Sequence, residues 1–316
     1  MTLLLAVDGG QTGLRMSIVR DGRPGETAEV GGFAPGTGDE SLAIAAAVDE
    51  ARATLDAAGP VDRICLGLTG APGDLERQRR LVALLSERLG GAQVALGGDM
   101  VTAHAGALAG QAGVVVAAGT GTVVLGVAGD GAAHRADGLG YLLGDDASGF
   151  AIAQAAVRAA LRALEDRGPQ TTLTAAAAAY FGDLEDLPYR LRTSASPVAA
   201  IAGFAPDVAA AARAGDGVAS TIWAEAATRL VDTTASVVRR TFPHAEPGSV
   251  ALSHTGRLLR ARDLLLEPFL AELAARCPAA CHRAPAGDAL DGAARLAAHG
   301  LGRHAGLMHA TEGWTG

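Results

Sequence analysis

Short apolar runs alternate with longer amphipathic segments through the first hundred residues. Strands are expected at residues 3–7, 14–19, 27–30, 64–68 and 94–96. Apolar residues at helical spacing predict helices at 40–58, 75–89 and 101–108. Asp21-Gly22 separates the second strand from the third, so the first three strands form a meander. Strands that alternate with helices predict an α/β fold with a mostly parallel sheet.

The pattern at the start of the chain then repeats. Residues 114–117 and 123–127 read as two strands joined by a turn of Gly and Thr residues, like the two strands that flank Asp8 to Thr12. Thr12 and Thr120 are 108 positions apart, the length of one domain, so we infer two related domains. The remaining sequence predicts helices at 147–165, 171–180, 198–213 and 217–240 and a strand at 249–252.

Histidines recur every five residues near the end of the chain. This spacing spreads His299, His304 and His309 around a helix rather than gathering them. We therefore interpret them as surface residues.

Composition excludes several classes of function. The chain has 316 residues with 49% hydrophobic and 19% charged, which is typical of a globular protein, and a net charge of -8 disfavours nucleic acid and anionic lipid as partners. It contains no lysine and no asparagine, which excludes a Walker-type P-loop, a Schiff-base lysine and the strand lysine of protein kinases. Glycines interrupt the uncharged stretch 100–129, which argues against a membrane span, and the first ten residues do not resemble a secretory signal. We expect a cytoplasmic protein.

Two turns have the composition of phosphate-binding loops. Glycines and a threonine between two strands can direct backbone N–H groups at one point, where a phosphate is held without lysine. One turn comprises Asp8, Gly9, Gly10, Gln11 and Thr12; the other comprises Gly119, Thr120, Gly121 and Thr122. Asp8 is also a candidate Mg2+ partner, since Mg2+ prefers one or two carboxylates. Alternatively, both are hairpin turns whose glycines serve only backbone geometry.

Two acidic positions could carry chemistry or merely cap helices. Asp99 follows the strand at 94–96 and opens a helix, so it is either an N-cap or a general base for a hydroxyl that attacks a γ-phosphoryl group. The segment 138–149 places Asp145 and Asp146 between several glycines and a long helix. Either carboxylate could cap that helix. The same turn is also suited to hydrogen-bonding the hydroxyls of a sugar.

Three motifs together resemble a known family. They are residues 7–13 (Val-Asp-Gly-Gly-Gln-Thr-Gly), residues 118–122 (Ala-Gly-Thr-Gly-Thr) and the Gly-rich segment 138–149. They are similar to the N-acetylglucosamine kinase branch of the BadF/BadG/BcrA/BcrD ATPase family, within the superfamily of acetate and sugar kinases, Hsc70 and actin. The resemblance implies an α/β fold of two ribonuclease-H-like domains flanking a cleft for ATP and Mg2+. We expect an N-terminal lobe at 1–110, joined by the C-terminal helix at about 288–316, and a C-terminal lobe at 111–287.

The resemblance also implies site residues. Asp99 matches the base that deprotonates the C6 hydroxyl of the sugar. Thr12, Thr120 and Thr122 match positions that contact phosphate or substrate. The turn that holds the sugar corresponds to Gly138, Leu139, Gly140 and Asp145. Homodimers are usual among such kinases.

The chain departs from the family pattern in two places. The loop 31–38 contains no asparagine to bind the sugar, and an unpaired sugar group costs about 1 to 3 kcal/mol, enough to change the preferred sugar. The adenosine segment 253–257 keeps one of two expected glycines, Gly256, and continues with Arg257, which either stacks on adenine or obstructs it.

The expected function is ATP-dependent phosphorylation of an amino sugar, N-acetylglucosamine or a close hexosamine. One alternative is an activator ATPase for a 2-hydroxyacyl-CoA dehydratase or benzoyl-CoA reductase, but such proteins carry a cysteine in the turn matching Asp145 and Asp146, and none is present here. Another is a non-catalytic sugar or nucleotide sensor.

Overall fold

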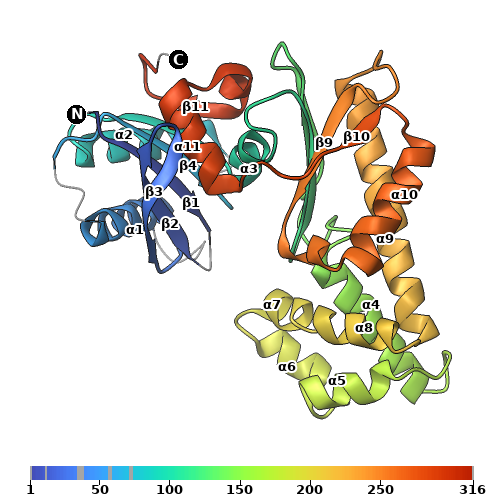
Figure 1. Cartoon of the computed structure of the whole chain (residues 1–316). Coiled ribbons are helices and arrows are strands. Elements are labelled where there is room, and N and C mark those ends of the chain that lie inside the picture. Colours follow the sequence, from blue (N-terminus) through green and yellow to red (C-terminus); the bar gives the residue numbers. More distant parts are fainter. Residues whose placement is uncertain (1, 11–12, 34–38, 56–58, 71–73, 315–316) are drawn as a thin grey trace. The chain divides into compact units, whose positions relative to one another are not determined.

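A computed structural model describes residues 2–10, 13–33, 39–55, 59–70 and 74–314. The chain divides into two compact units, which are described separately below (Figure 1). The first contains residues 1–115, 125–134 and 283–316; the second contains residues 116–124 and 135–282. None of the helices in the described ranges is both long and apolar enough to cross a bilayer.

The first unit is built on a six-stranded mixed sheet of order β11-β5-β4-β1-β2-β3. Its strands are β1 (Leu4–Gly9), β2 (Leu14–Arg20), β3 (Arg23–Val30), β4 (Arg63–Leu68), β5 (Gln93–Gly98) and β11 (Met308–Ala310). The meander β1-β2-β3 is antiparallel, as predicted, and β1, β4 and β5 are parallel in register. Consequently the three neighbouring strands β1, β4 and β5 have their carboxyl ends at the same level of the sheet, at Gly9, Leu68 and Gly98.

Helices cover both faces of this sheet. Alternate residues of a strand face opposite sides, so Leu5 and Val7 pack with α1 (Glu40–Thr54) and α2 (Leu75–Arg88), whereas Ala6 packs with α11 (Ala289–His299). α3 (Asp99–Ala107) lies beside α11. The small residue Ala6 on the second face allows α11 to approach the sheet closely.

Two glycines permit α3 and α11 to touch through their backbones. A Cβ atom on Gly106 would lie 1.8 Å from the carbonyl oxygen of Asp288, and one on Gly292 would lie 1.8 Å from that of Thr102. No side chain fits at either position without separating the helices. The glycine at 292 therefore fixes where α3, and hence Asp99, lies.

A buried histidine pair joins α3 to the end of the chain. The Nε2–H of His104 donates to the Gly113 carbonyl at 3.0 Å, so His104 Nδ1 is the acceptor for His304 Nε2–H, also at 3.0 Å. The prediction of a surface position is wrong for His304, which is 1% exposed, because α11 ends at His299 and a 3-10 helix (Gly302–Leu307) turns His304 inward.

The second sheet has the order β10-β9-β6-β7-β8. Its strands are β6 (Gly113–Ala118), β7 (Thr122–Val127), β8 (Ala133–Asp137), β9 (Val250–Thr255) and β10 (Ala280–His282). The helices of the second unit are α4 (Gly149–Leu164), α5 (Leu173–Phe181), α6 (Leu187–Thr193), α7 (Pro197–Ala202), α8 (Ala205–Arg213), α9 (Gly217–Thr241) and α10 (Glu267–Arg276). A 3-10 helix (Arg257–Arg260) and a π-helix (Arg262–Leu266) follow β9.

The α/β class expected from the alternation of strands and helices is confirmed, but the expectation of a mostly parallel sheet is wrong for the first unit, where the pairs β11-β5, β1-β2 and β2-β3 are antiparallel. The single helix predicted at 198–213 is wrong, because the chain breaks between α7 and α8 at Gly203. A Cβ atom at Gly203 would lie 2.2 Å from the Tyr180 hydroxyl, so the glycine leaves room for this side chain of α5.

Candidate functional site

The first candidate turn follows β1 and is held by backbone contacts. Gly10 N–H donates to the Gly13 carbonyl at 2.9 Å, and the Gly9 carbonyl accepts from Thr69 N–H at 2.8 Å. A Cβ atom on Gly10 would lie 3.1 Å from the side chain of Thr69, so glycine leaves room for that side chain. Gln11 and Thr12, the other two positions predicted to bind phosphate, lie outside the described residues.

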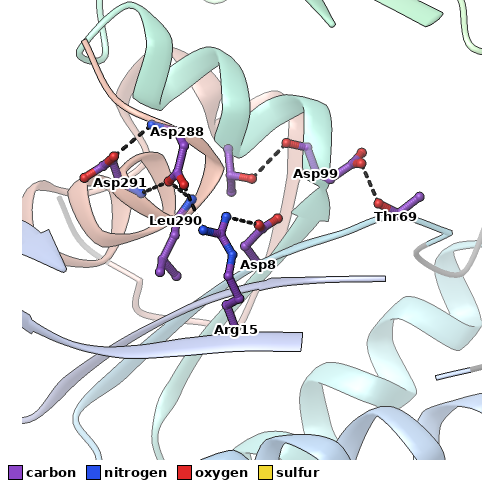
Figure 2. A network of polar contacts seen from close by, with 8 residues as sticks. Asp8, Arg15, Thr69, Asp99, Asp288, Leu290 and Asp291 are labelled. Carbon is purple, nitrogen blue, oxygen red and sulfur yellow. Dashed lines mark hydrogen bonds and ion pairs between the residues drawn. The ribbon is translucent and has the colours of Figure 1, made fainter. Parts of the chain in front are cut away.

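Asp8 is part of an ionic network that sequence analysis did not identify (Figure 2). Arg15 lies opposite Asp8 in the antiparallel pair β1-β2, and its Nη2 donates to Asp8 Oδ2 at 2.5 Å. Its Nη1 donates to Asp288 Oδ2 at 2.9 Å. Asp288 also caps α11 by accepting from the N–H groups of Leu290 and Asp291. Arg15 thus links Asp8, at the N-terminal turn, to the start of α11.

Burial and charge act in opposite directions on these carboxyl groups. Burial raises the pKa of Asp8 above its ordinary value, although Arg15 lowers it, and the nearby Asp288 and Asp99 raise it further. Burial would also raise the pKa of Asp288, but hydrogen bonds from Asp291 N–H and Arg15 bring it below its ordinary value. A cation close to Asp8 would stabilise its ionised form.

Asp99 is the first residue of α3 and not its cap. The N-cap of α3 is Gly98, so the interpretation of Asp99 as an N-cap is wrong. Its Oδ1 accepts from Met100 N–H at 2.7 Å. Its Oδ2 accepts from the Thr69 hydroxyl at 2.6 Å, a contact that Figure 2 shows. The partly exposed carboxylate of Asp99 therefore has a defined orientation at the carboxyl end of β5.

The donor set around Asp8 fits Mg2+. The cluster contains three carboxylates, those of Asp8, Asp99 and Asp288, and one guanidinium, that of Arg15. Its net charge is therefore negative. Across the described ranges, no three His, Cys, Asp or Glu side chains form a complete metal cage. Mg2+ does not require one, since it binds through one or two carboxylates, water and substrate phosphates.

The second candidate turn joins β6 to β7. Gly119 N–H donates to the Gly121 carbonyl at 2.8 Å, and the Gly119 carbonyl accepts from Gly149 N–H at 2.8 Å, which ties the turn to the start of α4. Thr120 is exposed at the tip, and in the part of the chain that the structure describes neither its N–H nor that of Gly121 donates to the backbone. Two N–H groups at one exposed tip can receive an anion. Thr122, in contrast to Thr120, is buried, with 2% of the residue exposed.

The Gly-rich segment 138–149 is organised by a carboxylate outside it. Asp137, the last residue of β8, accepts hydrogen bonds on Oδ1 from the N–H groups of Gly138 (2.8 Å) and Asp145 (2.6 Å) and on Oδ2 from Asp146 N–H (3.1 Å). Both Asp137 and Asp145 have positive φ, 63° and 61°, which is strained for residues other than glycine. Sequence analysis missed Asp137 because the Asp-Gly pair at 137–138 is an ordinary turn signal.

Asp145 connects this segment to the second candidate turn. Its Oδ1 accepts from Thr122 N–H at 3.0 Å, and burial raises its pKa against the lowering effect of that hydrogen bond. The interpretation of Asp145 or Asp146 as the cap of α4 is wrong, since the Ser148 side chain accepts from Ala151 N–H. At the predicted sugar turn Leu139 is 68% exposed and Gly140 is exposed, whereas the backbone of Gly138 is already hydrogen-bonded: its N–H donates to Asp137 and its carbonyl accepts from Arg135.

The predicted adenosine segment lies directly against the second candidate turn. A Cβ atom on Gly256 would lie 2.1 Å from the Ala118 carbonyl oxygen, and Gly256 has a φ of 100°. Only glycine allows β9 to approach the end of β6 so closely. Arg257 begins the following 3-10 helix and is exposed, so within the second unit a guanidinium, a turn of N–H groups and the Gly-rich segment are neighbours.

Comparison with known proteins finds one matching family and several similar kinases. The model of the BadF/BadG/BcrA/BcrD ATPase family matches residues 5–297. An N-acetylmuramic acid/N-acetylglucosamine kinase of Clostridium acetobutylicum is 32% identical over 111 residues, and an N-acetyl-D-glucosamine kinase of Dictyostelium discoideum is 37% identical over 117 residues. These alignments cover 35% and 36% of this chain and 36% of each relative. A crystal structure of a candidate N-acetylglucosamine kinase from Chromobacterium violaceum has a TM-score of 0.73 at 29% identity and covers 94% of this chain and 99% of that one.

Proposed function

Since the chain belongs to the BadF/BadG/BcrA/BcrD ATPase family, we propose that it is an ATP-dependent kinase that phosphorylates the C6 hydroxyl of an amino sugar. The substrate proposed is N-acetylglucosamine or a closely related hexosamine, because both curated relatives are named as kinases of this class. The observation that carries the proposal is the carboxylate of Asp99, oriented by two hydrogen bonds at a strand end and close enough to Asp8 to influence its ionisation.

In the proposed reaction Asp99 accepts the proton of the sugar hydroxyl. The hydroxyl oxygen forms a bond to the γ-phosphorus of ATP, the bond between that phosphorus and the bridging oxygen of the β-phosphate breaks, and ADP leaves. Asp8, whose carboxylate is fixed by Arg15, would hold Mg2+, and the bound ion would supply positive charge to the phosphate oxygens. The N–H groups of Thr120 and Gly121 bind phosphate.

Sugar recognition is assigned to the turn of Gly138, Leu139, Gly140 and Asp145. The assignment is supported by Asp145, whose Oδ1 accepts from Thr122 N–H at 3.0 Å and which can also accept hydrogen bonds from sugar hydroxyls. We propose that Gly256 and Arg257 contact the adenosine of ATP. A homodimer remains a prediction, measured by light scattering of the purified protein.

The test is ADP release measured over a panel of N-acetylated amino sugars, muramic derivatives and neutral hexoses. Product NMR then identifies the phosphorylated hydroxyl. Asp99→Asn should lower kcat by about 10²- to 10⁴-fold, the usual contribution of a general base. The matched control is Asp21→Asn, in an exposed Asp-Gly turn that accepts asparagine. Full activity of Asp99→Asn on a responding sugar would remove Asp99 from the mechanism, and absence of any responding sugar would refute the kinase.

The activator ATPase requires a separate readout. An activator would need cysteines for an iron–sulfur cluster, whereas Cys65 and Cys277 are buried and Cys281 lies at the second sheet rather than in the segment 138–149. Iron analysis of protein purified without oxygen should therefore find no cluster. Stoichiometric iron together with ATP hydrolysis that no sugar stimulates would favour the activator instead.

A further inference from the structure

Three parallel strand ends place Thr69 between the N-terminal turn and Asp99. In register, Gly9 of β1 pairs with Leu68 of β4, and Leu68 pairs with Gly98 of β5. The next residues in the chain therefore lie in one row at the carboxyl ends of these strands: Gly10, Thr69 and Asp99. Figure 2 shows the Thr69 and Asp99 side chains pointing toward each other.

The Thr69 hydroxyl is the donor that binds the second oxygen of the Asp99 carboxylate. A carboxylate can only accept, so the 2.6 Å contact is a hydrogen bond from Thr69 Oγ1–H to Asp99 Oδ2. The other oxygen, Oδ1, accepts from Met100 N–H at 2.7 Å. Two donors, one on each oxygen, hold the plane of the carboxylate, and a hydrogen bond to a charged group is among the strong ones.

Thr69 is itself held in place by its backbone and by its neighbour. Its N–H donates to the Gly9 carbonyl at 2.8 Å, which ties it to the end of β1. The missing side chain at Gly10 leaves the space that the Thr69 side chain occupies, with only 3.1 Å to a hypothetical Cβ atom. A β-branched side chain also has few rotamers, so threonine presents its hydroxyl in a defined direction.

We propose that Thr69 is a positioning residue for the general base Asp99, an inference that rests on the proposed kinase function. Thr69 orients the carboxylate toward the sugar hydroxyl and does not bind the sugar itself. The hydroxyl is the active part of the side chain, so serine replaces it and valine, which has the same shape without the donor, does not. Loss of orientation slows the chemical step while leaving ground-state binding of the sugar intact.

A double-mutant cycle tests this assignment. Thr69→Val should lower kcat about tenfold with less than a twofold change in the KM of the sugar, and Thr69→Ser should retain activity within about twofold of the unmodified protein. In an Asp99→Ala background, Thr69→Val should have no further effect, because the carboxylate that it orients is absent. Circular dichroism and the melting temperature of each variant establish that it is folded.

The outcomes separate this proposal from the function on which it rests. No sugar-dependent ADP release by the unmodified protein overturns the kinase and with it the positioning role. An active unmodified protein together with an unchanged kcat in Thr69→Val overturns the positioning role alone. An equal loss from Thr69→Val with and without the Asp99 carboxylate, or a loss in Thr69→Ser as large as in Thr69→Val, also overturns it, because either result describes a purely structural contribution.

Discussion

The buried pair His104 and His304 should make the first unit sensitive to mild acid. Burial, together with the charge of the neighbouring Arg303, lowers the pKa of each histidine to about 4. The fold therefore prefers the neutral rings, in which one nitrogen donates and the other accepts. A second proton would place two N–H groups face to face across the 3.0 Å contact.

The sign and size of the effect follow from linkage. A histidine with a folded pKa below its unfolded value contributes full stability above the unfolded pKa and loses it as the pH falls toward the folded pKa. With an unfolded pKa of about 6.5, each histidine removes about 2 kcal/mol between pH 7 and pH 5, or about 4 kcal/mol for the pair.

Urea denaturation at pH 7 and at pH 5 measures this loss. The variant that carries both His104→Gln and His304→Gln lacks the two titrating rings, so its free energy of unfolding should change between the two pH values by about 4 kcal/mol less than that of the unmodified protein. His244→Gln, at an exposed histidine, provides the baseline for removing a histidine elsewhere. Equal changes in the unmodified protein and the double variant would refute the reasoning.

Three further substitutions test how the candidate sites are built. Gly292→Ala should lower the free energy of unfolding in urea by about 3 kcal/mol, because its methyl group overlaps the backbone of α3. The control Gly217→Ala, whose methyl group enters open space, should leave that free energy unchanged. Equal effects of the two substitutions would contradict the close crossing of the helices. Asp137→Asn should raise the KM of the sugar about tenfold and the KM of ATP by less. One of the two oxygens that accept from backbone N–H groups becomes an NH2 donor, which cannot accept. An unchanged KM of the sugar would show that Asp137 has no role in sugar binding. Gly256→Ala should raise the KM of ATP more than tenfold in the same assay, because it displaces β9 from β6, and an unchanged value would remove this segment from the nucleotide site.

The sequence predicted the elements that have strong periodicity. β1, β2, β4 and β5 were identified because each is a compact apolar run between turn residues. β3 was predicted only at 27–30 but begins at Arg23, because residues 23–26 are not apolar. β8 was missed because half-polar strands at a sheet edge lack that signal, and β10 and β11 were missed because each has only three residues. The helix break at Gly203 was missed because alanines continue the helical pattern on both sides of it, although Pro206 marks the start of α8.

The candidate site was predicted as a set of motifs but not as a network. Local patterns identified the two turns, Asp99 and the Gly-rich segment, since each has a distinctive composition. Arg15 and Thr69 were missed because their roles depend on strand register, which the local pattern does not show. Asp137 was missed because the Asp-Gly pair at 137–138 is an ordinary turn signal. The buried His304 was missed because α11 ends at His299, so the assumed helical spacing does not continue, and because its partner lies 200 positions away.

The order of translation has a consequence for the first unit, because its last helix is made late. Between residue 107, the end of α3, and residue 289, the start of α11, a ribosome needs roughly 10 to 40 s at ordinary elongation rates. During this interval the sheet face formed by Ala6, Cys65 and Ala95 lacks the helix that covers it in the finished protein. The second unit, whose residues 135–282 are all synthesised before α11, can fold first, and the growing chain presents an uncovered apolar face to chaperones until α11 arrives.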